Sequence, residues 1–463
     1  MTVDVMQQAR AMCQGLLLGG GLGVLYDLLR VVRVRGKLRW LGHGYGGGGK
    51  MTRICVIGGG PAGMMAAYQA ASCGAEVTVF ERNPFAGKKL RITGKGRCNV
   101  TNDCTRETFF ASVPTNPKFL YSAAARFTPA DTMAFFAESG VPLKVERGNR
   151  VFPVSDKAVD VAHALEKRCR NAGVTFRFGC RVTEMAKADP GYILCIADGT
   201  AVRTERCDRV IVATGGVSYP ATGSDGDGHR MLAAQGIPVT PLSPSLVPVE
   251  TKEDVSEMMG LSLRNVTLTV TRGGKTVFQE MGEMLFTHFG VSGPLVLSAS
   301  ANMQKGSVSD YRFSIDLKPA LDRDTLDKRI LSDLTQYAHR DLCNALDDLL
   351  PKSLIPYFIG ASGVSGRKKA GELTREERLR LVEQCKGMTL TPTKFRPMAE
   401  AIITHGGVSV KAVQPGTMEL RELPGVYVCG ELLDTDAYTG GFNLQIAFST
   451  AYVAGRNAAG EGE

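Results

Sequence analysis

The sequence contains no C-x-x-C pair, although it has 12 cysteines among 463 residues. Without such pairs, zinc ribbons and thioredoxin-like redox sites are excluded. Single scattered cysteines in a long chain are typical of a reducing compartment, so we expect a cytoplasmic protein. The EF-hand pattern is also absent, because the acidic pair Asp225 and Asp227 has no closing glutamate at the required spacing. We therefore expect no metal site.

Long apolar runs are missing as well. The uncharged stretch from Ala11 to Tyr26 is shorter than the roughly 20 residues of a membrane span, so no stable membrane insertion is expected. The net charge of +9 is concentrated in residues 1–50, whose seven Lys/Arg and two Asp leave only +4 for the remaining chain. A +4 balance over 51–463 is not typical of a nucleic-acid-binding protein, and we expect a small-molecule substrate and no nucleic acid.

Residues 1–50 differ from the rest of the chain in composition, with a Leu- and Gly-rich stretch followed by basic residues. Gly15-Leu16-Leu17-Leu18 through Arg30 resembles the beginning of a spore-cortex membrane protein family. Gly46-Gly47-Gly48-Gly49-Lys50 stands directly before Met51, as a translated purine-rich ribosome-binding site would. We predict that the working protein begins at Met51; the alternative is that the basic, apolar segment is a membrane-surface anchor.

A dinucleotide-binding motif follows Met51. The apolar run from Ile54 to Ile57 leads into glycines and then into a small-residue segment with helical character. This order of strand, turn and helix is the context that a G-x-G-x-x-G match requires, with the helix start directed at a pyrophosphate. The next strand, 76–80, ends at an acid placed to bind a ribose. The motif predicts these cofactor-binding residues: Gly58, Gly60, Pro61, Ala62, Gly63, Glu81 and Arg82.

Two further segments read as cofactor-contacting loops. Residues 84–102 interleave Gly, Lys and Arg without helical or strand periodicity, which indicates a loop. The apolar strand 209–212 runs into small residues that let the chain pass close to a dinucleotide. These segments supply the candidates Lys89, Gly94, Gly96, Arg97, Cys98, Asn99, Ala213, Thr214, Gly215, Gly216 and Tyr219.

The run from Gly87 to Asn102 resembles the signature of a bacterial flavoprotein family. This family comprises NAD(P)/FAD-dependent oxidoreductases of the aminoacetone-oxidase type and includes the 3-dehydro-bile-acid Δ4,6-reductase. The resemblance extends over essentially all of 51–463. It implies FAD as cofactor, a backbone contact of Val182 with the adenine, and a second FAD motif around the strand 425–429. It also implies a helix start near the flavin pyrimidine. The residues implied are Val182, Gly430, Glu431, Asp434, Gly440, Gly441, Asn443, Leu444, Gln445 and Ile446.

The resulting fold prediction is α/β: a Rossmann-type FAD-binding domain of the glutathione-reductase kind with an inserted domain. We assign 51–242 and 394–463 to the FAD-binding domain and 243–393 to the insertion. Within the insertion, 243–320 has the alternating pattern of a β-barrel-like part and 321–393 that of helices. We predict one helix from Leu321 to Leu350 and another from Thr374 to Cys385. His288 in the β part either lines the substrate cleft or holds a turn.

The chemistry expected of this chain is flavin redox chemistry, in which the protein supplies orientation and electrostatics. His405, Arg97 and Cys98 are the catalytic candidates; a structural histidine and a packing thiol are the alternatives for His405 and Cys98. Only one dinucleotide fingerprint is convincing, so NAD(P)H, the expected co-substrate, docks without a Rossmann domain of its own. The resemblance favours reduction of a C=C bond conjugated to a ketone, as in a 3-oxo-Δ4,6 bile acid or steroid-like enone, by hydride transfer through flavin N5. The alternatives are oxidation of an amine or aminoketone by O₂, and a flavin-bound accessory role without turnover. The oligomeric state is not predicted.

Overall fold

The computed structural model describes residues 51–199 and 201–460. The predictions for residues 1–50 therefore lie outside the described residues. No helix within the described ranges has the length and apolar character needed to span a membrane. The same ranges contain no cluster of three or more His, Cys, Asp or Glu arranged to hold a metal.

The first of two large hydrophobic cores is built around a parallel five-stranded sheet with the strand order β20-β10-β1-β2-β6. Its strands are β1 (Arg53–Ile57), β2 (Glu76–Glu81), β6 (Thr175–Phe178), β10 (Arg209–Val212) and β20 (Val426–Val428). Buried parallel strands read as continuous apolar runs because both faces are covered, and Ile54 to Ile57 has this pattern. The Rossmann-type α/β prediction is confirmed.

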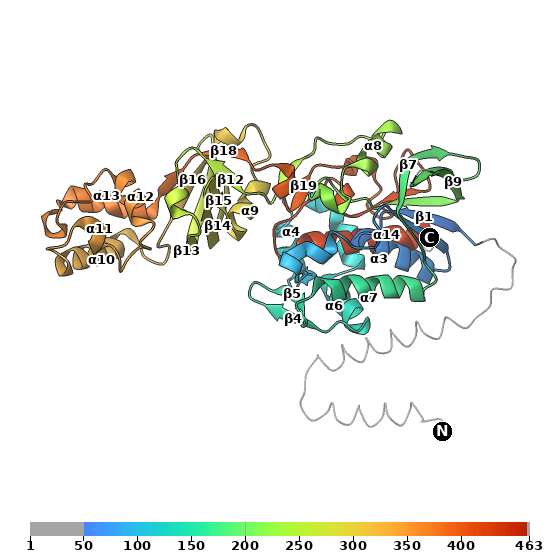
Figure 1. Ribbon diagram of the computed structural model, residues 1–463, viewed down its shortest axis with the longest axis horizontal. Helices are drawn as coiled ribbons and strands as arrows, with labels where there is room; N and C mark the ends of the chain where they lie inside the picture. The colour runs from blue at the N-terminus through green and yellow to red at the C-terminus, as the bar shows by residue number, and fades with distance from the viewer. Residues whose placement is uncertain (1–50, 200, 461–463) are drawn as a thin grey trace, which may run out of the picture. The chain divides into compact units, whose positions relative to one another are not determined.

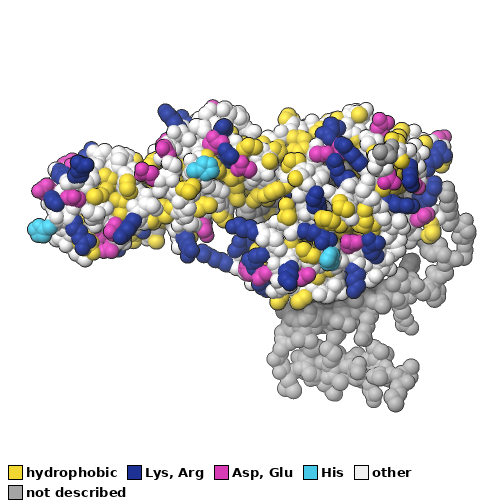
Figure 2. All heavy atoms as spheres, in the orientation of Figure 1, with side chains coloured by type: hydrophobic (Ala, Val, Ile, Leu, Met, Phe, Trp, Pro, Cys, Tyr) yellow, Lys and Arg dark blue, Asp and Glu magenta, His cyan; other side chains and the backbone are white. Residues whose placement is uncertain are grey.

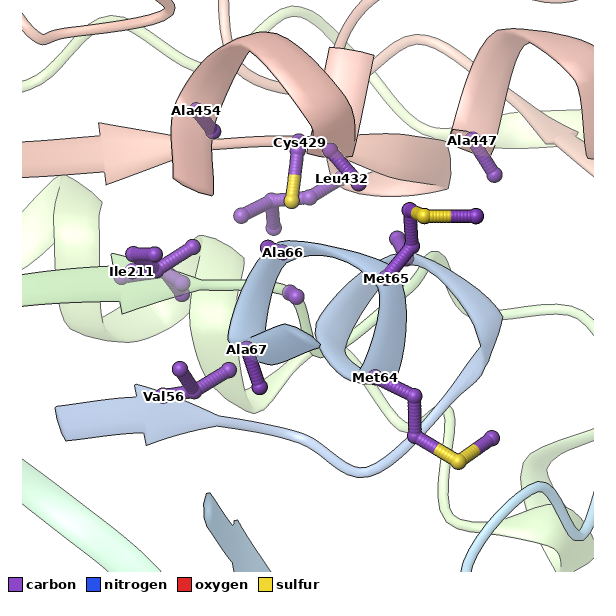
Figure 3. Close-up of a cluster of buried hydrophobic side chains, with 14 of the residues drawn as sticks. Val56, Met64, Met65, Ala66, Ala67, Ile211, Cys429, Leu432, Ala447 and Ala454 are labelled. Carbon is purple, nitrogen blue, oxygen red and sulfur yellow. The ribbon is translucent and has the colours of Figure 1, made fainter. Parts of the chain in front are cut away.

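Two helices from opposite ends of the chain cover this sheet. The helix α3 (Pro61–Ser72) follows β1, and α14 (Phe442–Ala458) comes from the C-terminal segment. They cross closely, because a Cβ on Gly455 would lie 2.3 Å from the carbonyl oxygen of Ala66. Met65 points toward Ala447 on α14, while Ala67 points toward Val56 on β1 (Figure 3). Figure 1 shows the C-terminal segment lying against the N-terminal elements.

The first core also contains smaller elements. The helices are α4 (Arg106–Ala111), α5 (Tyr121–Arg126), α6 (Pro129–Glu138), α7 (Ala158–Asn171) and α8 (Asp227–Ala234). One small sheet has the order β3-β5-β4 (Thr101–Asn102, Arg150–Pro153, Leu143–Glu146), and another has the order β7-β8-β9 (Cys180–Lys187, Tyr192–Asp198, Ala201–Cys207). The predicted loop 84–102 contains a 3-10 segment, η2 (Leu90–Gly96), which non-helical dihedral angles at Thr93, Gly94 and Lys95 interrupt.

A second hydrophobic core lies between Val249 and Leu390. Its sheet has seven strands in the order β17-β16-β13-β14-β15-β12-β18. They are β12 (Val249–Thr251), β13 (Ser262–Arg272), β14 (Lys275–Thr287), β15 (Gly290–Ser292), β16 (Tyr311–Asp316), β17 (Met388–Leu390) and β18 (Pro392–Phe395). The helix α9 (Pro294–Ala301) follows β15. Neighbouring strands in this sheet pair in the antiparallel direction. The alternating apolar and polar residues of 243–320 are typical of such strands.

Four helices belong to the same second core (Figure 1). They are α10 (Arg323–Gln336), α11 (Leu342–Ala345), α12 (Ile355–Ser362) and α13 (Arg375–Lys386). The predicted helix from Leu321 to Leu350 is wrong as a continuous element, because α10 ends at Gln336 and only the single turn α11 follows. The boundaries 243 and 393 of the insertion stay a prediction. A two-stranded sheet, β11 (Ser243–Ser245) with β19 (Ile403–His405), joins the first residues of the predicted insertion to the segment that follows it.

Candidate functional site

A cavity of about 1280 Å³ opens along the carboxyl ends of the parallel strands. This volume exceeds the roughly 1,000 Å³ at the upper end of small-ligand pockets. The end of β1, the start of α3, the loop after β10 and the start of α14 all line it, together with β13, β14 and α9. The cavity therefore has space for a dinucleotide and for part of a second molecule.

The turn between β1 and α3 has the geometry of a phosphate cradle. Gly58 has φ +104°, and a Cβ on Gly63 would lie 1.8 Å from the carbonyl oxygen of Gly58. A Cβ on Gly60, in contrast, would meet no atom within 4 Å, although Gly60 lines the cavity. The space beside Gly60 is therefore left for a ligand, and the free amides of the first turn of α3 face an anion favourably. These features fit a dinucleotide pyrophosphate.

Glu81 ends β2 beside this turn. The residue is only 7% exposed, and its carboxylate accepts hydrogen bonds from the backbone N–H of Gly59 and of Asn83, both at 2.8 Å, and from Asn83 Nδ2 at 2.7 Å. Two of these donors share Oε1, so Oε2, which has the single donor Gly59, keeps a lone pair for a ribose hydroxyl. Farther along the same wall, Arg82 donates to Asp225 at 2.5 Å, and Arg181 donates to Asp227.

Lys89 connects the loop 84–102 to the end of β20. Its Nζ donates to Glu431 and to Ser218 Oγ, both at 2.7 Å. Glu431 also accepts from Ser218 Oγ at 2.9 Å and from the backbone N–H of Thr404 at 3.0 Å. Because the Lys89–Glu431 pair is mostly shielded from water, it fixes the loop more firmly than an exposed ion pair would.

Arg97 lines the cavity and is held from behind by two carboxylates. Its guanidinium donates to Glu146 and to Asp156, and it stacks on the Phe152 ring 4.2 Å from the centroid. The hydrogen bonds to Glu146 and then to Asp156 raise the pKa of Arg97. Hydrogen bonds to the two carboxylates engage four of its five N–H groups, so one N–H of Nη1 remains for a ligand.

Cys98 does not reach the cavity. Its side chain is completely buried, and burial raises its pKa to about 12 against an opposing hydrogen bond with Thr93. The group is therefore a neutral thiol near pH 7, and thiols of this kind are weak nucleophiles.

The start of α14 closes the other end of the cavity. A Cβ on Gly441, which has φ +96°, would lie 2.3 Å from the carbonyl oxygen of Thr101. Gln445 fixes this approach: its Oε1 accepts from Thr101 Oγ1 at 2.6 Å and from Thr132 Oγ1 at 2.8 Å. The amides of the first turn of α14 are free of intrahelical partners, so they and the helix dipole favour negative charge at this point.

Three buried polar atoms on the cavity wall have no partner among the described residues. They are Asn99 Oδ1, Thr214 Oγ1 and Thr435 Oγ1. Buried polar atoms are normally hydrogen-bonded, so unpaired ones on a cavity wall indicate the polar edge of a bound group. Together with the space beside Gly60, they show that these residues fit a dinucleotide cofactor.

His405 lies at the end of β19, outside the cavity lining. Its Nδ1 is 3.2 Å from Asp436 Oδ1 and 3.5 Å from Thr115 Oγ1. Burial by itself lowers the pKa of His405, but the hydrogen bond and charge of Asp436 outweigh burial and raise it. Ser245 Oγ donates to the second carboxylate oxygen of Asp436 at 2.8 Å, so the pair is anchored in the protein.

Most of the sequence-based candidates meet on one cavity wall. The lining includes Gly58, Gly60, Pro61, Ala62, Glu81, Arg82, Lys89, Gly94, Arg97, Asn99, Val182, Ala213, Thr214, Gly215, Glu431, Gly440, Gly441, Asn443, Leu444 and Ile446. The candidates that do not line it are Gly63, Gly96, Cys98, Gly216, Tyr219, Gly430, Asp434, Gln445 and His405. His288 is an exposed residue of the β14–β15 turn and does not line it either.

The sequence analysis missed the opposite wall. This wall combines side chains from the second sheet and α9 with others from the segments around β11 and β19 and before α14. Its members include Leu246, Arg264, Asn265, Met281, Glu283, Pro294, Leu297, Ile402, Ile403 and Tyr438. Arg147 and Arg150 of the β4–β5 turn were missed as well; they line the cavity beside the start of α14, because Asn102, which pairs with Arg150, donates to the carbonyl oxygens of Gly148 and Gly440. No motif marks them, because single residues on separate strands and turns carry no spacing signal.

Comparison with known proteins agrees with this geometry. The model of the HI0933-like protein Rossmann domain family matches residues 52–457. A 3-dehydro-bile acid Δ(4,6)-reductase of Clostridium scindens is 32% identical over 413 residues, covering 88% of this chain and 99% of that protein. A ribosomal RNA dihydrouridine synthase of Escherichia coli is 30% identical over 403 residues, covering 87% of this chain and 96% of that protein.

Solved structures of similar fold include the 3-ketosteroid-Δ4-(5α)-dehydrogenase of Rhodococcus jostii RHA1. It shows 14% sequence identity and a TM-score of 0.46, and the match covers 90% of this chain and 98% of that one. The family model spans most of the sequence, and the relatives match over nearly their full length. The chain belongs to the HI0933-like family of FAD-dependent oxidoreductases.

Proposed function

We propose that this protein is an FAD-dependent reductase of a C=C bond conjugated to a carbonyl group, with NAD(P)H as reductant. The finer substrate class that we propose is a 3-oxo-Δ4,6 bile acid or a similar steroid-like enone. The observation that carries the proposal is the two-sided cavity: one wall fits a dinucleotide, and the other carries apolar residues such as Met281 and Leu297. The bile-acid reductase relative supports the same choice.

The residues that line the cavity suggest which part of the reaction each group would carry out. When bound, FAD would supply hydride acceptance and donation at its N5. The residues that would hold it are those of the β1–α3 turn, Glu81, the Lys89–Glu431 pair and the start of α14. The α14 dipole would stabilise negative charge at the pyrimidine end, and the remaining N–H of Arg97 would orient an oxygen of the bound molecule. The predicted catalytic roles of His405 and Cys98 remain untested.

Ribosomal RNA is a second candidate substrate. The uracil ring also contains a C=C bond conjugated to a carbonyl, and relatives in Escherichia coli and Haemophilus influenzae are named ribosomal RNA dihydrouridine synthases. These relatives weigh against our expectation of no nucleic-acid partner, which depended only on the small net charge of 51–463. For both candidate substrates, the steroid-like enone and ribosomal RNA, we propose that the protein acts in the cytoplasm. Buried free thiols such as Cys98 and Cys429 are compatible with this location.

Anaerobic stopped-flow spectroscopy of the purified holoprotein tests the proposal. We expect NADH or NADPH to bleach the flavin, and a 3-oxo-Δ4,6 steroid to restore its absorbance with formation of a product that has one C=C bond fewer. Bleaching by an amine, with peroxide formed on exposure to O₂, would instead identify an oxidase. Restoration by rRNA but not by the steroid would select the second candidate. A colourless protein that does not take up FAD would overturn the proposal altogether.

A further inference from the structure

Four basic side chains lie at the opening of the cavity. They are Lys95 in η2, Arg147 and Arg150 at the β4–β5 turn, and Arg264 on β13; we call them the basic rim. All four are exposed although they line the cavity, which places them at its edge rather than in its depth.

The basic rim differs from the other cations of the same cavity. Arg82, Lys89, Arg97 and Arg181 are each paired with a carboxylate. Lys88 forms no ion pair with a described residue, but it donates to Asn83 Oδ1 and to the carbonyl oxygen of Ala221. Within the described ranges, none of the four rim side chains forms an ion pair. Glu146, which is opposite Arg150 in the β4–β5 pairing, is already bound to Arg97. Glu283 is the exposed carboxylate among the described residues that line the cavity, and it accepts a hydrogen bond from Ser262 Oγ at 2.7 Å. The rim therefore carries positive charge that no ion pair within the described ranges neutralises.

The rim charges come from two separately built parts of the protein. Arg264 belongs to the seven-stranded sheet, where the register between β13 and β14 shifts between Leu263 and Val266 and the following Asn265 has φ +58°. Arg147 and Arg150 flank a turn with positive φ at Gly148 and Asn149. Figure 2 shows Lys and Arg side chains on both sides of the hollow between these parts. Like charges that converge on one opening without a counter-charge favour an anion between them.

Apolar surface continues inward from the rim. Met281 is 66% exposed at the edge, and Pro294, Leu297 and Ile402 line the same cavity. A ligand that suits both features has an apolar or planar body directed into the cavity and a negative group left at the opening. A neutral enone would use only the inner part.

We propose that Arg147 and Arg264, assisted by Lys95 and Arg150, bind an oxyanion, either a carboxylate or a phosphate, carried by the molecule whose C=C bond is reduced. This inference rests on the proposed function and deepens it by defining the substrate as an anion. Guanidinium groups suit both oxyanions because they donate two parallel hydrogen bonds.

The test measures binding to the oxidised holoprotein in the absence of NAD(P)H, by perturbation of the flavin spectrum. The probes are two matched pairs: cholate with its neutral methyl ester, and uridine monophosphate with uridine. The variants are the double substitution Arg147→Gln/Arg264→Gln and the control Lys275→Gln. Lys275 lies at the other end of the β13–β14 hairpin, is exposed, forms no ion pair with a described residue and does not line the cavity.

We expect wild-type protein and Lys275→Gln to bind the charged member of one pair about tenfold more tightly than its neutral partner. The double variant should lose this preference, and raising NaCl from about 0.05 to about 0.5 M should weaken it in the wild type. A preference within the cholate pair identifies a carboxylate, and one within the uridine pair identifies a phosphate.

Two results would overturn the inference. They are equal binding of both members in both pairs, and a charge preference that survives in the double variant. Because no turnover is measured, these results are independent of the proposed reaction. If the stopped-flow experiment shows enone reduction but the binding experiment shows no preference for the charged probe, only the inference about the rim is wrong. If the charged probe is preferred but no enone is reduced, only the proposed function is wrong.

Discussion

Gly60 and Gly63 stand in the same turn, but a side chain at each would meet different surroundings. A Cβ on Gly63 would collide with the carbonyl oxygen of Gly58, whereas a Cβ on Gly60 would project into free cavity space. Gly63 is thus required by the fold of the turn, and Gly60 by the ligand that occupies the cavity. Substitution of each glycine by alanine separates the two requirements.

We expect Gly60→Ala to weaken FAD binding by about tenfold or more, because the new methyl group occupies the space for the pyrophosphate. The apoprotein should lose no more than about 1 kcal/mol, since Gly60 is the N-cap of α3 and alanine caps less well. Gly63→Ala should instead cost about 3 kcal/mol or more in the apoprotein through overpacking. Urea unfolding of the apoprotein and fluorescence titration with FAD measure the two effects. Unchanged FAD affinity in Gly60→Ala would contradict the assignment of the cradle.

The His405–Asp436 pair predicts a pH-dependent contribution to stability. The pKa of His405 is raised in the folded state, so its proton is bound more tightly there than in the unfolded chain. Such a group contributes its full stabilisation below its ordinary pKa of about 6.5, and the contribution is lost as the pH rises through the raised value.

We therefore expect His405→Gln to be less stable than the wild type by about 1.5–3 kcal/mol near pH 6, since hydrogen bonds to charged groups are worth this much. The difference should shrink at a higher pH such as 9, because the stabilisation is lost as the pH rises through the raised pKa. Urea unfolding at the two pH values measures it. A difference that is constant with pH would show that the imidazolium does not stabilise the fold. A large loss of enone reduction with normal stability would favour the catalytic role.

At the scale of single elements, α14 is positioned by a buried polar network. Gln445 accepts from Thr101 and Thr132, and its Nε2 donates to the carbonyl oxygen of Phe127 at 3.1 Å and to Ser449 Oγ at 3.0 Å. All four hydrogen bonds are buried, and they join the first turn of α14 to β3, α6 and the residue that ends α5. The network therefore sets where the start of α14 meets the cavity.

Gln445→Leu keeps the size of the side chain but leaves the hydroxyls of Thr101 and Thr132 without their acceptor. We expect it to destabilise the protein by about 2–4 kcal/mol and to weaken FAD binding, although Gln445 itself does not line the cavity. Ser449→Ala is the control, because the Phe127 carbonyl keeps its bond from Gln445. Thermal unfolding with and without FAD compares the variants. Equal behaviour of the two would show that the network does not position the helix.

The elements that sequence analysis located are those in which local residues decide the structure. The run Ile54–Ile57, the glycines after it and the acid that ends β2 specify a strand, a turn and a ribose position within one stretch of chain. The basic rim escaped prediction because Arg264 and Arg147 meet only through tertiary packing. The helix expected over 321–350 failed for a similar reason. Tyr337 caps the end of α10, and the chain then turns so that Leu342 and Leu346 reach the second core, which periodicity alone does not encode.

In the molecule as a whole, each of the two large hydrophobic cores supports a different part of the cavity lining. The first core, built from both ends of the described chain, presents the glycine turns and carboxylates that fit a cofactor. The second core supports β13, β14 and α9, which supply the apolar part of the opposite wall. In 321–393, no residue lines the cavity. A change on the second wall should therefore alter the handling of substrate without altering cofactor content.

Met281→Lys tests this division. Met281 is exposed, so the substitution has little effect on folding, but it places a charge on the apolar wall. We expect the KM for an uncharged enone steroid to rise about threefold, because the exposed ammonium stays in water while the apolar contact made by Met281 is lost. The flavin content should stay that of the wild type. Val277→Lys on the same strand is the matched control, because Val277 is also exposed but lies outside the cavity. Steady-state kinetics and the ratio of flavin to protein absorbance give both quantities. Loss of flavin in Met281→Lys, or an equal rise of KM in Val277→Lys, would show that the two walls do not serve separate ligands.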